Sequence, residues 1–165
     1  MFRFDLTVNR ADLQEALKNA NVMAFLRAIR LGEGTTDEAG YYRLVGGGTF
    51  TDDRWHPNVR VFVKRYNVHS SAAGAYQIIN RTWQGLKRIY GFPDFSPACQ
   101  DEAAVALIWG RRALNDVIDG RFDVAIRKCA LEWASLPGSA AGQRIESLES
   151  LRQAYTDAGG TFAIA

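Results

Sequence analysis

The sequence predicts one α+β domain in which helices dominate and a small β-lobe forms a lip over a groove. Apolar residues recur at helical spacing before residue 35 and again from residue 73 onward. Between these parts, residues 35–72 are rich in glycine, aspartate, β-branched and aromatic residues instead. With 165 residues, of which 47% are hydrophobic and 23% charged, the chain is long enough to bury the core of a single domain.

The N-terminal segment, residues 1–20, predicts a strand followed by a short helix. Apolar and polar residues alternate from Phe2 to Val8, which is the period of a strand and not the pattern of a targeting segment. Asn9 is placed to cap the helix that follows. The inward face of this helix would carry Leu13, Ala16, Leu17 and Ala20.

A second helix is expected over residues 21–34, with Asn21 as its cap. Glycines on either side of Glu33 would end it. In the β-lobe, residues 42–51 predict a hairpin that turns at three consecutive glycines. The alternation at residues 59–64 predicts a further short strand or flap.

The C-terminal half predicts four helices, over residues 81–90, 98–118, 122–133 and about 143–158. Ser96 and Pro97 form a strong start signal for the second of these. That helix is apolar all round, so we expect it to lie at the centre of the domain. The inward face of the last helix would carry Ile145, Leu148, Leu151 and Tyr155.

The charge balance excludes some partners. The 20 basic and 18 acidic residues give a net charge of +2, too slight to indicate nucleic-acid binding. An anionic polymer or acidic cell surface would suit the small excess of positive charge weakly.

No stretch approaches the ~18 apolar residues of a membrane span, so synthesis in the cytoplasm without stable membrane insertion is expected. We also expect a monomer.

Glu33 is the most informative residue, because it lies between two glycines where a helix should stop. A carboxylate there faces the negative end of the helix dipole. If apolar walls also exclude water, its pKa rises and it can hold a proton near neutral pH. A general acid acting on a glycosidic oxygen needs this property. A solvated glutamate in a glycine-rich turn is the alternative for this short motif taken alone.

Other chemistries find weaker support. The spacing of His56 and His69 does not indicate a zinc site, and both are expected in loops. Cys99 and Cys129 fall in apolar helices, which favours two buried, inert free thiols over a nucleophile or a disulfide. No phosphate loop or dinucleotide fingerprint is present. No metal and no cofactor are therefore expected.

Cleavage of a glycoside by two carboxylates would require a partner for Glu33. Four candidates lie in the expected β-lobe, and spacing distinguishes none of them: Asp37, Glu38, Asp52 and Asp53. A partner is needed only if water or an enzyme nucleophile completes the reaction. If a hydroxyl of the substrate attacks, one residue can donate a proton first and remove one afterwards.

A series of short motifs follows one another between Val22 and Thr161: Gly32-Glu33-Gly34-Thr35, Val45-Gly46-Gly47, Phe50-Thr51-Asp52, His56-Pro57, Gly74-Ala75-Tyr76-Gln77, Asp94-Phe95-Ser96-Pro97, Trp133-Ala134-Ser135-Leu136-Pro137-Gly138 and Ala158-Gly159-Gly160-Thr161. In these motifs and their order, the chain resembles the family of lambda-type phage endolysins. It implies a lysozyme-like fold and cleavage of the β-1,4 bond between N-acetylmuramic acid and N-acetylglucosamine in peptidoglycan. The implied product has a 1,6-anhydromuramoyl end, which makes the enzyme a lytic transglycosylase. The matching catalytic acid is Glu33, and no catalytic aspartate is expected.

The resemblance also suggests residues that contact the glycan strand. Tyr76 and Gln77 lie in a segment similar to the Gly-x-x-Gln motif of lytic transglycosylases, although a helix-start glutamine in solvent is the alternative. Trp133 and Ser135 would reach the same groove, with a core position equally consistent for the tryptophan. The β-lobe would contribute Tyr42 and Asp52, and packing of the hairpin would explain Tyr42 equally well.

The chain departs from the family pattern in two regions, and three alternative functions remain open. Residues before Val22 have no clear counterpart in the family, so they form an extra packing layer, a partner-binding arm or a wall-binding element. The pair Arg54-Trp55 and the stretch from Val59 to Val68 also depart from the family pattern. The rivals are a hydrolysing muramidase in which Asp37 or Asp52 positions water, a non-catalytic wall-binding module and, more distantly, a cysteine or zinc amidase. Release to periplasmic peptidoglycan would require a membrane-permeabilising partner such as a holin.

Overall fold

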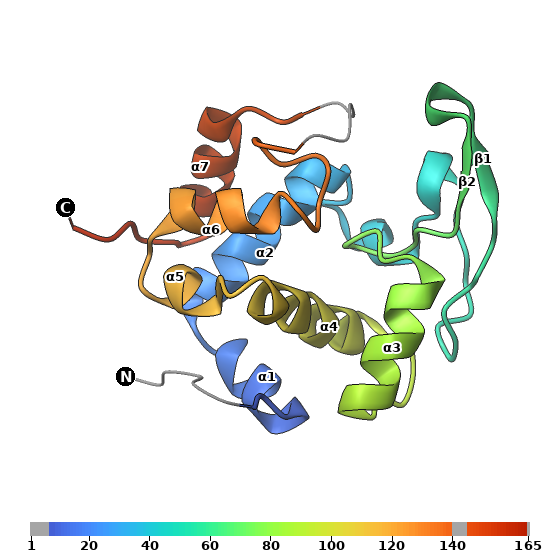
Figure 1. Cartoon of the computed structure of the whole chain (residues 1–165), viewed down its shortest axis with the longest axis horizontal. Coiled ribbons are helices and arrows are strands. Elements are labelled where there is room, and N and C mark those ends of the chain that lie inside the picture. The colour runs from blue at the N-terminus through green and yellow to red at the C-terminus, as the bar shows by residue number, and fades with distance from the viewer. Residues whose placement is uncertain (1–6, 140–144, 165) are drawn as a thin grey trace.

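The protein, seen as a computed structural model, is described over residues 7–139 and 145–164. Helices make up most of this part of the chain (Figure 1). They are α1 (Arg10–Ala16), α2 (Ala20–Glu33), α3 (Asn80–Tyr90), α4 (Pro97–Gly110), α5 (Leu114–Ile118), α6 (Phe122–Cys129) and α7 (Leu148–Asp157). Strands β1 (Val61–Val63) and β2 (Val68–Ser70) form the two-stranded sheet. The mostly helical α+β fold is therefore confirmed.

The core is built around α4, as its apolar sequence predicts. Ala103, Val105 and Ile108 of α4 are fully buried. Helix α2 contributes Phe25 and Ile29 to the same core and packs along α7. The β-lobe and α3 lie at one end of the molecule, whereas α5, α6 and α7 lie at the other (Figure 1). In the described residues no helix is long and apolar enough to cross a membrane.

Helix α1 forms a packing layer on α4. Asn9 caps it as predicted, since its side chain accepts from the Asp12 backbone N–H while the Asp12 carboxylate accepts from that of Asn9. Leu13 is fully buried, and Arg10 forms a 2.7 Å ion pair with Glu102 of α4. Most of the predicted N-terminal strand, residues 1–6, lies outside the described residues, and the chain is already helical at Arg10.

Two helix boundaries differ from the prediction. Helix α2 begins at Ala20, because the Asn19 side chain accepts from the N–H groups of Asn21 and Val22 and so acts as the cap that was assigned to Asn21. The single helix expected over 98–118 is interrupted between α4 and α5. Arg112 there adopts φ +56°, a left-handed conformation that cannot continue an α-helix.

The last two helices are shorter than predicted. Helix α6 ends at Cys129, and turns follow it where the helix was expected to reach Trp133. Helix α7 begins at Leu148 because the Ser147 side chain caps it. Residues 140–144 of the predicted helix lie outside the described residues, and Ile145, expected to face inward, is 47% exposed.

The hairpin predicted over 42–51 is wrong in form. Two short 3₁₀ helices, Glu38–Tyr42 and Val45–Gly47, occupy this region, and only the bridge between Arg43 and Thr49 remains of the expected pairing. Gly46 and Gly47 adopt positive φ and fold the chain into a tight turn. The strand expected near residue 61 is present as β1 and pairs antiparallel with β2, which includes His69.

Candidate active site

A cavity of about 260 Å³ lies where the end of α2, the β-lobe and the loop after α6 meet. Its lining residues are Glu33, Val45, Val63, Tyr66, Val68, Ser70, Ala72, Gln77, Ile79, Glu132, Trp133 and Ala134. Most of these residues are apolar, and the polar groups among them belong to Glu33, Tyr66, Ser70, Gln77 and Glu132. A lining of this kind suits a ligand with apolar faces and a small number of hydrogen-bonding groups.

Glu33 is the last residue of α2, at the boundary that the sequence predicted. Gly34 follows in the left-handed conformation, with φ +70°, and its N–H donates to the carbonyls of Arg30 and Leu31. This geometry favours glycine because the conformation is costly for a residue with a Cβ atom. The turn ends the helix immediately after Glu33 and so places its carboxylate at the cavity.

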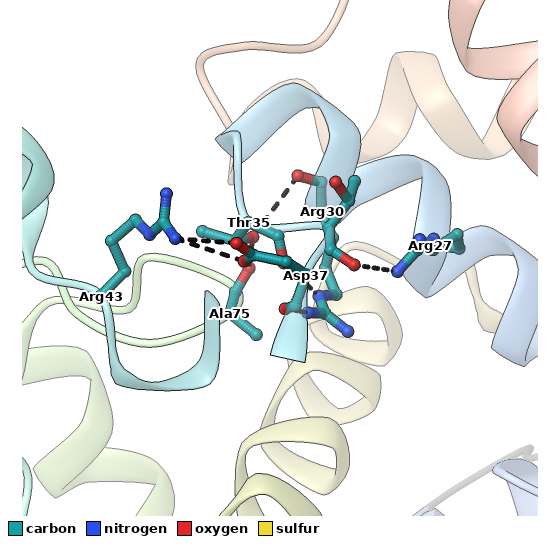
Figure 2. Close-up of polar contacts among 7 residues, drawn as sticks. Arg27, Arg30, Thr35, Asp37, Arg43 and Ala75 are labelled. Atoms are coloured by element: carbon teal, nitrogen blue, oxygen red, sulfur yellow. Dashed lines mark hydrogen bonds and ion pairs between the residues drawn. The ribbon is translucent and has the colours of Figure 1, made fainter. Parts of the chain in front are cut away.

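The chain after Glu33 is held by side chains from α2 (Figure 2). Arg30, which is buried, donates to the carbonyl of Thr35 at 2.8 Å and to that of Asp37 at 2.5 Å. The Thr35 hydroxyl donates to the carbonyl of Ala75, in the segment that leads to Gln77. These contacts join the end of α2 to a second wall of the cavity, so the two walls keep a fixed relative position.

The Glu33 carboxylate has one hydrogen-bond partner in the described part of the chain. The Ser135 hydroxyl donates to Glu33 Oε1 at 2.7 Å. Burial raises the pKa of Glu33 above its usual range, and the hydrogen bond from Ser135 opposes part of that rise. Gly32 is required for this contact, because an added Cβ would lie 2.6 Å from Ser135 Oγ.

Gln77 and Trp133 lie in the same cavity lining. The Gln77 amide donates to the carbonyls of Gly74 at 2.9 Å and Arg43 at 3.3 Å, so its oxygen remains to accept a hydrogen bond from a ligand. Trp133 is only 3% exposed, and its indole N–H donates to the Tyr76 carbonyl at 3.0 Å. It is therefore a core residue with an edge in the cavity, and its contact with a sugar stays a prediction.

Three further predicted site residues do not line this cavity. Tyr76 is 2% exposed, its hydroxyl donates to Asp101 at 2.6 Å, and it borders a separate cavity of about 280 Å³. The Tyr42 hydroxyl donates to Asp53 at 3.0 Å. Asp52 forms a 2.7 Å ion pair with Arg54 on the surface. A direct contact between these side chains and a ligand of the Glu33 cavity is not supported by their positions.

The predicted partner carboxylates also lie outside the cavity lining. Asp37 binds the Arg43 guanidinium through both carboxylate oxygens, at 3.1 and 3.2 Å (Figure 2). Glu38 is exposed. The carboxylate that lines the cavity besides Glu33 is that of Glu132. Glu132 was not identified from the sequence, although the predicted site residue Trp133 directly follows it. Glu132 is held in a 2.7 Å ion pair with Arg111, a contact that sequence spacing does not reveal.

His56 and the two cysteines make contacts that do not suit catalysis, whereas His69, which was expected in a loop, is exposed in β2. His56 is buried in its loop, with Nε2 2.8 Å from the Ile78 carbonyl and Nδ1 accepting from the Asn58 N–H. Burial lowers its pKa. Cys99 and Cys129 are free and buried as predicted, and burial raises the pKa of Cys129 to about 12. The described ranges contain no group of three or more potential metal ligands.

Residues 23–162 match the family model described as Endolysin. The chain is 39% identical to the endolysin of Escherichia phage P2, covering 85% of this chain and 93% of that protein. It is 38% identical to the endolysin of Escherichia phage lambda, covering 84% and 90%. A solved structure of bacteriophage lambda lysozyme complexed with a chitohexasaccharide matches with a TM-score of 0.83 and 37% identity, over 87% of this chain and 97% of that one. With its lysozyme-like α+β fold, the chain belongs to the endolysin family.

Proposed function

We propose that this endolysin cleaves the β-1,4 bond between N-acetylmuramic acid and N-acetylglucosamine in peptidoglycan, and forms a 1,6-anhydromuramoyl end. One observation carries the proposal. In the described lining of the cavity, Glu33 is the carboxylate that no cation holds, and its pKa is raised by burial. The chitohexasaccharide bound by lambda lysozyme supports a glycan as the ligand of the corresponding groove.

In the first step, protonated Glu33 gives its proton to the glycosidic oxygen. The bond between this oxygen and C1 of the muramic acid breaks, its electron pair stays on the oxygen, and N-acetylglucosamine leaves with a new hydroxyl. Positive charge develops at C1 and the ring oxygen. A raised pKa favours the protonated form of Glu33 that this step requires.

In the second step, the C6 hydroxyl of the same muramic acid attacks C1. The new C1–O6 bond closes the anhydro ring, and the Glu33 carboxylate accepts the hydroxyl proton, which restores the acid. The Ser135 hydroxyl supports this half of the cycle, since it donates a hydrogen bond to the ionised form of Glu33. No water is consumed, so the reaction requires one carboxylate only.

The main rival is hydrolysis by a muramidase on the same scaffold. Asp37 and Asp52 are weak candidates for positioning water, because each is bound to an arginine outside the cavity lining. Glu132 is a better one, because it faces the cavity. Its carboxylate is paired with Arg111, whereas Glu33 is paired with no cation of the described residues, which favours the transglycosylase.

Mass analysis of the released muropeptides in H₂¹⁸O tests the proposal. We expect muramic ends lighter than the reducing ends by one water, with no ¹⁸O at C1. Labelled reducing ends would reject the transglycosylase and support hydrolysis. Glu33→Gln is expected to abolish release, and binding to sacculi without release by the unmutated protein would indicate a wall-binding module. The proposal includes a monomer that is made in the cytoplasm and reaches periplasmic peptidoglycan through a holin-like partner.

A further inference from the structure

The charges of this chain are distributed unevenly, which its net charge of +2 conceals. Residues 54–93 contain seven of the 20 basic residues and none of the 18 acidic residues. This segment forms β1, β2 and α3, which lie together at one end of the molecule (Figure 1). We call its basic side chains the basic lobe; they are Arg54, Arg60, Lys64, Arg65, Arg81, Lys87 and Arg88.

The basic lobe is open to solvent and largely unneutralised. All seven side chains are exposed except Lys87, which is half-buried with its ammonium 5.1 Å from the ring centre of Trp55. Of the seven cations, only Arg54 forms an ion pair within the described residues 7–139 and 145–164, and its partner is Asp52. The lobe therefore presents a surface of positive charge that the protein itself does not balance.

The opposite end of the molecule shows the contrast. Most of its basic residues are held by neighbouring carboxylates: Arg111 by Glu132, Arg121 by Asp116 and Asp119, Lys128 by Asp116, and Arg152 by Asp123. An anionic partner would thus be attracted more strongly to the basic lobe than to the end formed by α5, α6 and α7.

The basic lobe adjoins the cavity that contains Glu33, although none of its seven cations is among the lining residues. Val63 and Tyr66 line the cavity, while Arg60 and Lys64 flank β1 directly on either side. Arg65 lies over the ring of Tyr66, 5.6 Å from its centre. A polymer that extends from the cavity past Tyr66 would therefore pass beside unneutralised cations.

We propose that the basic lobe binds the free carboxylates of the peptide stems that peptidoglycan strands carry. This inference rests on the proposed function, because it takes the occupant of the cavity to be a peptidoglycan strand. The stems project from the muramic acid units, so carboxylates would follow the strand along the lobe. Exposed ion pairs contribute modestly each and are screened by salt, which makes the binding collective and dependent on ionic strength.

The test compares two double variants in a Glu33→Gln background, where binding is measured without turnover. Arg60→Gln/Lys64→Gln removes two cations of the lobe. Arg112→Gln/Arg127→Gln removes two exposed cations elsewhere that also have no ion pair among the described residues, and serves as the matched control. The probes are purified glycan strands with their peptide stems, and the same strands after enzymatic removal of the peptides. Kd is measured by calorimetry across a range of NaCl concentrations.

We expect the lobe variant to bind peptide-bearing strands about three- to tenfold more weakly and with a shallower salt dependence. Its affinity for peptide-free strands should equal that of the control. Equal affinities of both variants for peptide-bearing strands would overturn the proposal. So would binding to phosphatidylglycerol vesicles that the lobe variant alone loses while its strand affinity is unchanged. Reducing ends in the mass analysis would reject the transglycosylase and leave this binding result unaffected.

Discussion

The Ser135 hydroxyl donates to Glu33 Oε1 at 2.7 Å, a contact between residues 102 positions apart in the sequence. It joins the end of α2 to the loop after α6. Because this hydrogen bond stabilises the ionised carboxylate, it opposes the effect of burial on the pKa of Glu33. The balance between the two would set the pH range in which Glu33 donates and accepts protons.

Ser135→Ala should move the pH profile. Without the hydroxyl, the pKa of Glu33 rises further, so the alkaline limb of kcat/KM shifts to higher pH. We also expect kcat to fall about tenfold, in the range found for loss of a single positioning hydrogen bond. The check is a pH–rate profile on purified peptidoglycan, with Ser135→Thr as the variant that retains a hydroxyl. An unchanged alkaline limb would contradict this role.

Glu33→Gln should stabilise the protein in a pH-dependent way. Folding raises the pKa of Glu33, so the folded state binds more protons between the unfolded and folded pKa values, and stability falls as pH rises through that window. Glutamine does not ionise and avoids this loss. We expect a gain in Tm of about 2–4 °C at pH 7 that disappears below about pH 4. Thermal melts of both proteins across this range test it, and a gain independent of pH would argue against a raised pKa.

Gly32→Ala should reduce activity more than stability. The added Cβ would lie 2.6 Å from Ser135 Oγ, so the serine must move away from Glu33. The expected result is a fall in kcat of about tenfold or more, with unfolding changed by about 1 kcal/mol. Gly85→Ala in α3 is the control, because its added Cβ meets nothing within 4 Å and alanine favours a helix. Full activity of Gly32→Ala would show that the contact is dispensable.

Asp37→Asn separates the proposal from one of its rivals. Asp37 is an exposed partner of Arg43, and such surface pairs contribute about 0–1 kcal/mol. We expect kcat within about twofold of the unmutated enzyme, by the same energy scale. A loss as severe as that of Glu33→Gln, measured in the same turbidity assay on permeabilised Gram-negative cells, would instead identify Asp37 as a second catalytic carboxylate.

The sequence predicted features that depend on local rules. The end of α2 at Glu33, the cap at Asn9 and the start of α4 at Pro97 each follow from a few adjacent residues. The cap at Asn19 was missed because Asn21, two residues later, satisfies the same rule. The break at Arg112 was missed because the apolar pattern continues through it.

The composition of the cavity depended on contacts that no local pattern encodes. Gln77 and Trp133 line the cavity, as predicted. Glu132 also lines it, and its position depends on an ion pair with Arg111, 21 positions away in the sequence. Tyr76 was expected beside Gln77 in the groove, but adjacent residues on an irregular segment can face opposite sides. Its hydroxyl donates instead to the carboxylate of Asp101 in α4. Tertiary packing therefore determines which side chains of each motif face the cavity.

The two cysteines have a consequence for the timing of activity. Cys99 in α4 and Cys129 in α6 are the only cysteines of the chain, and both are buried as free thiols. Since no disulfide holds the fold, the protein can complete folding in a reducing compartment and keep the same covalent structure in an oxidising one. Under the proposed function, an enzyme of this design would need no disulfide formation at the cell wall, so its release alone would set the start of wall cleavage.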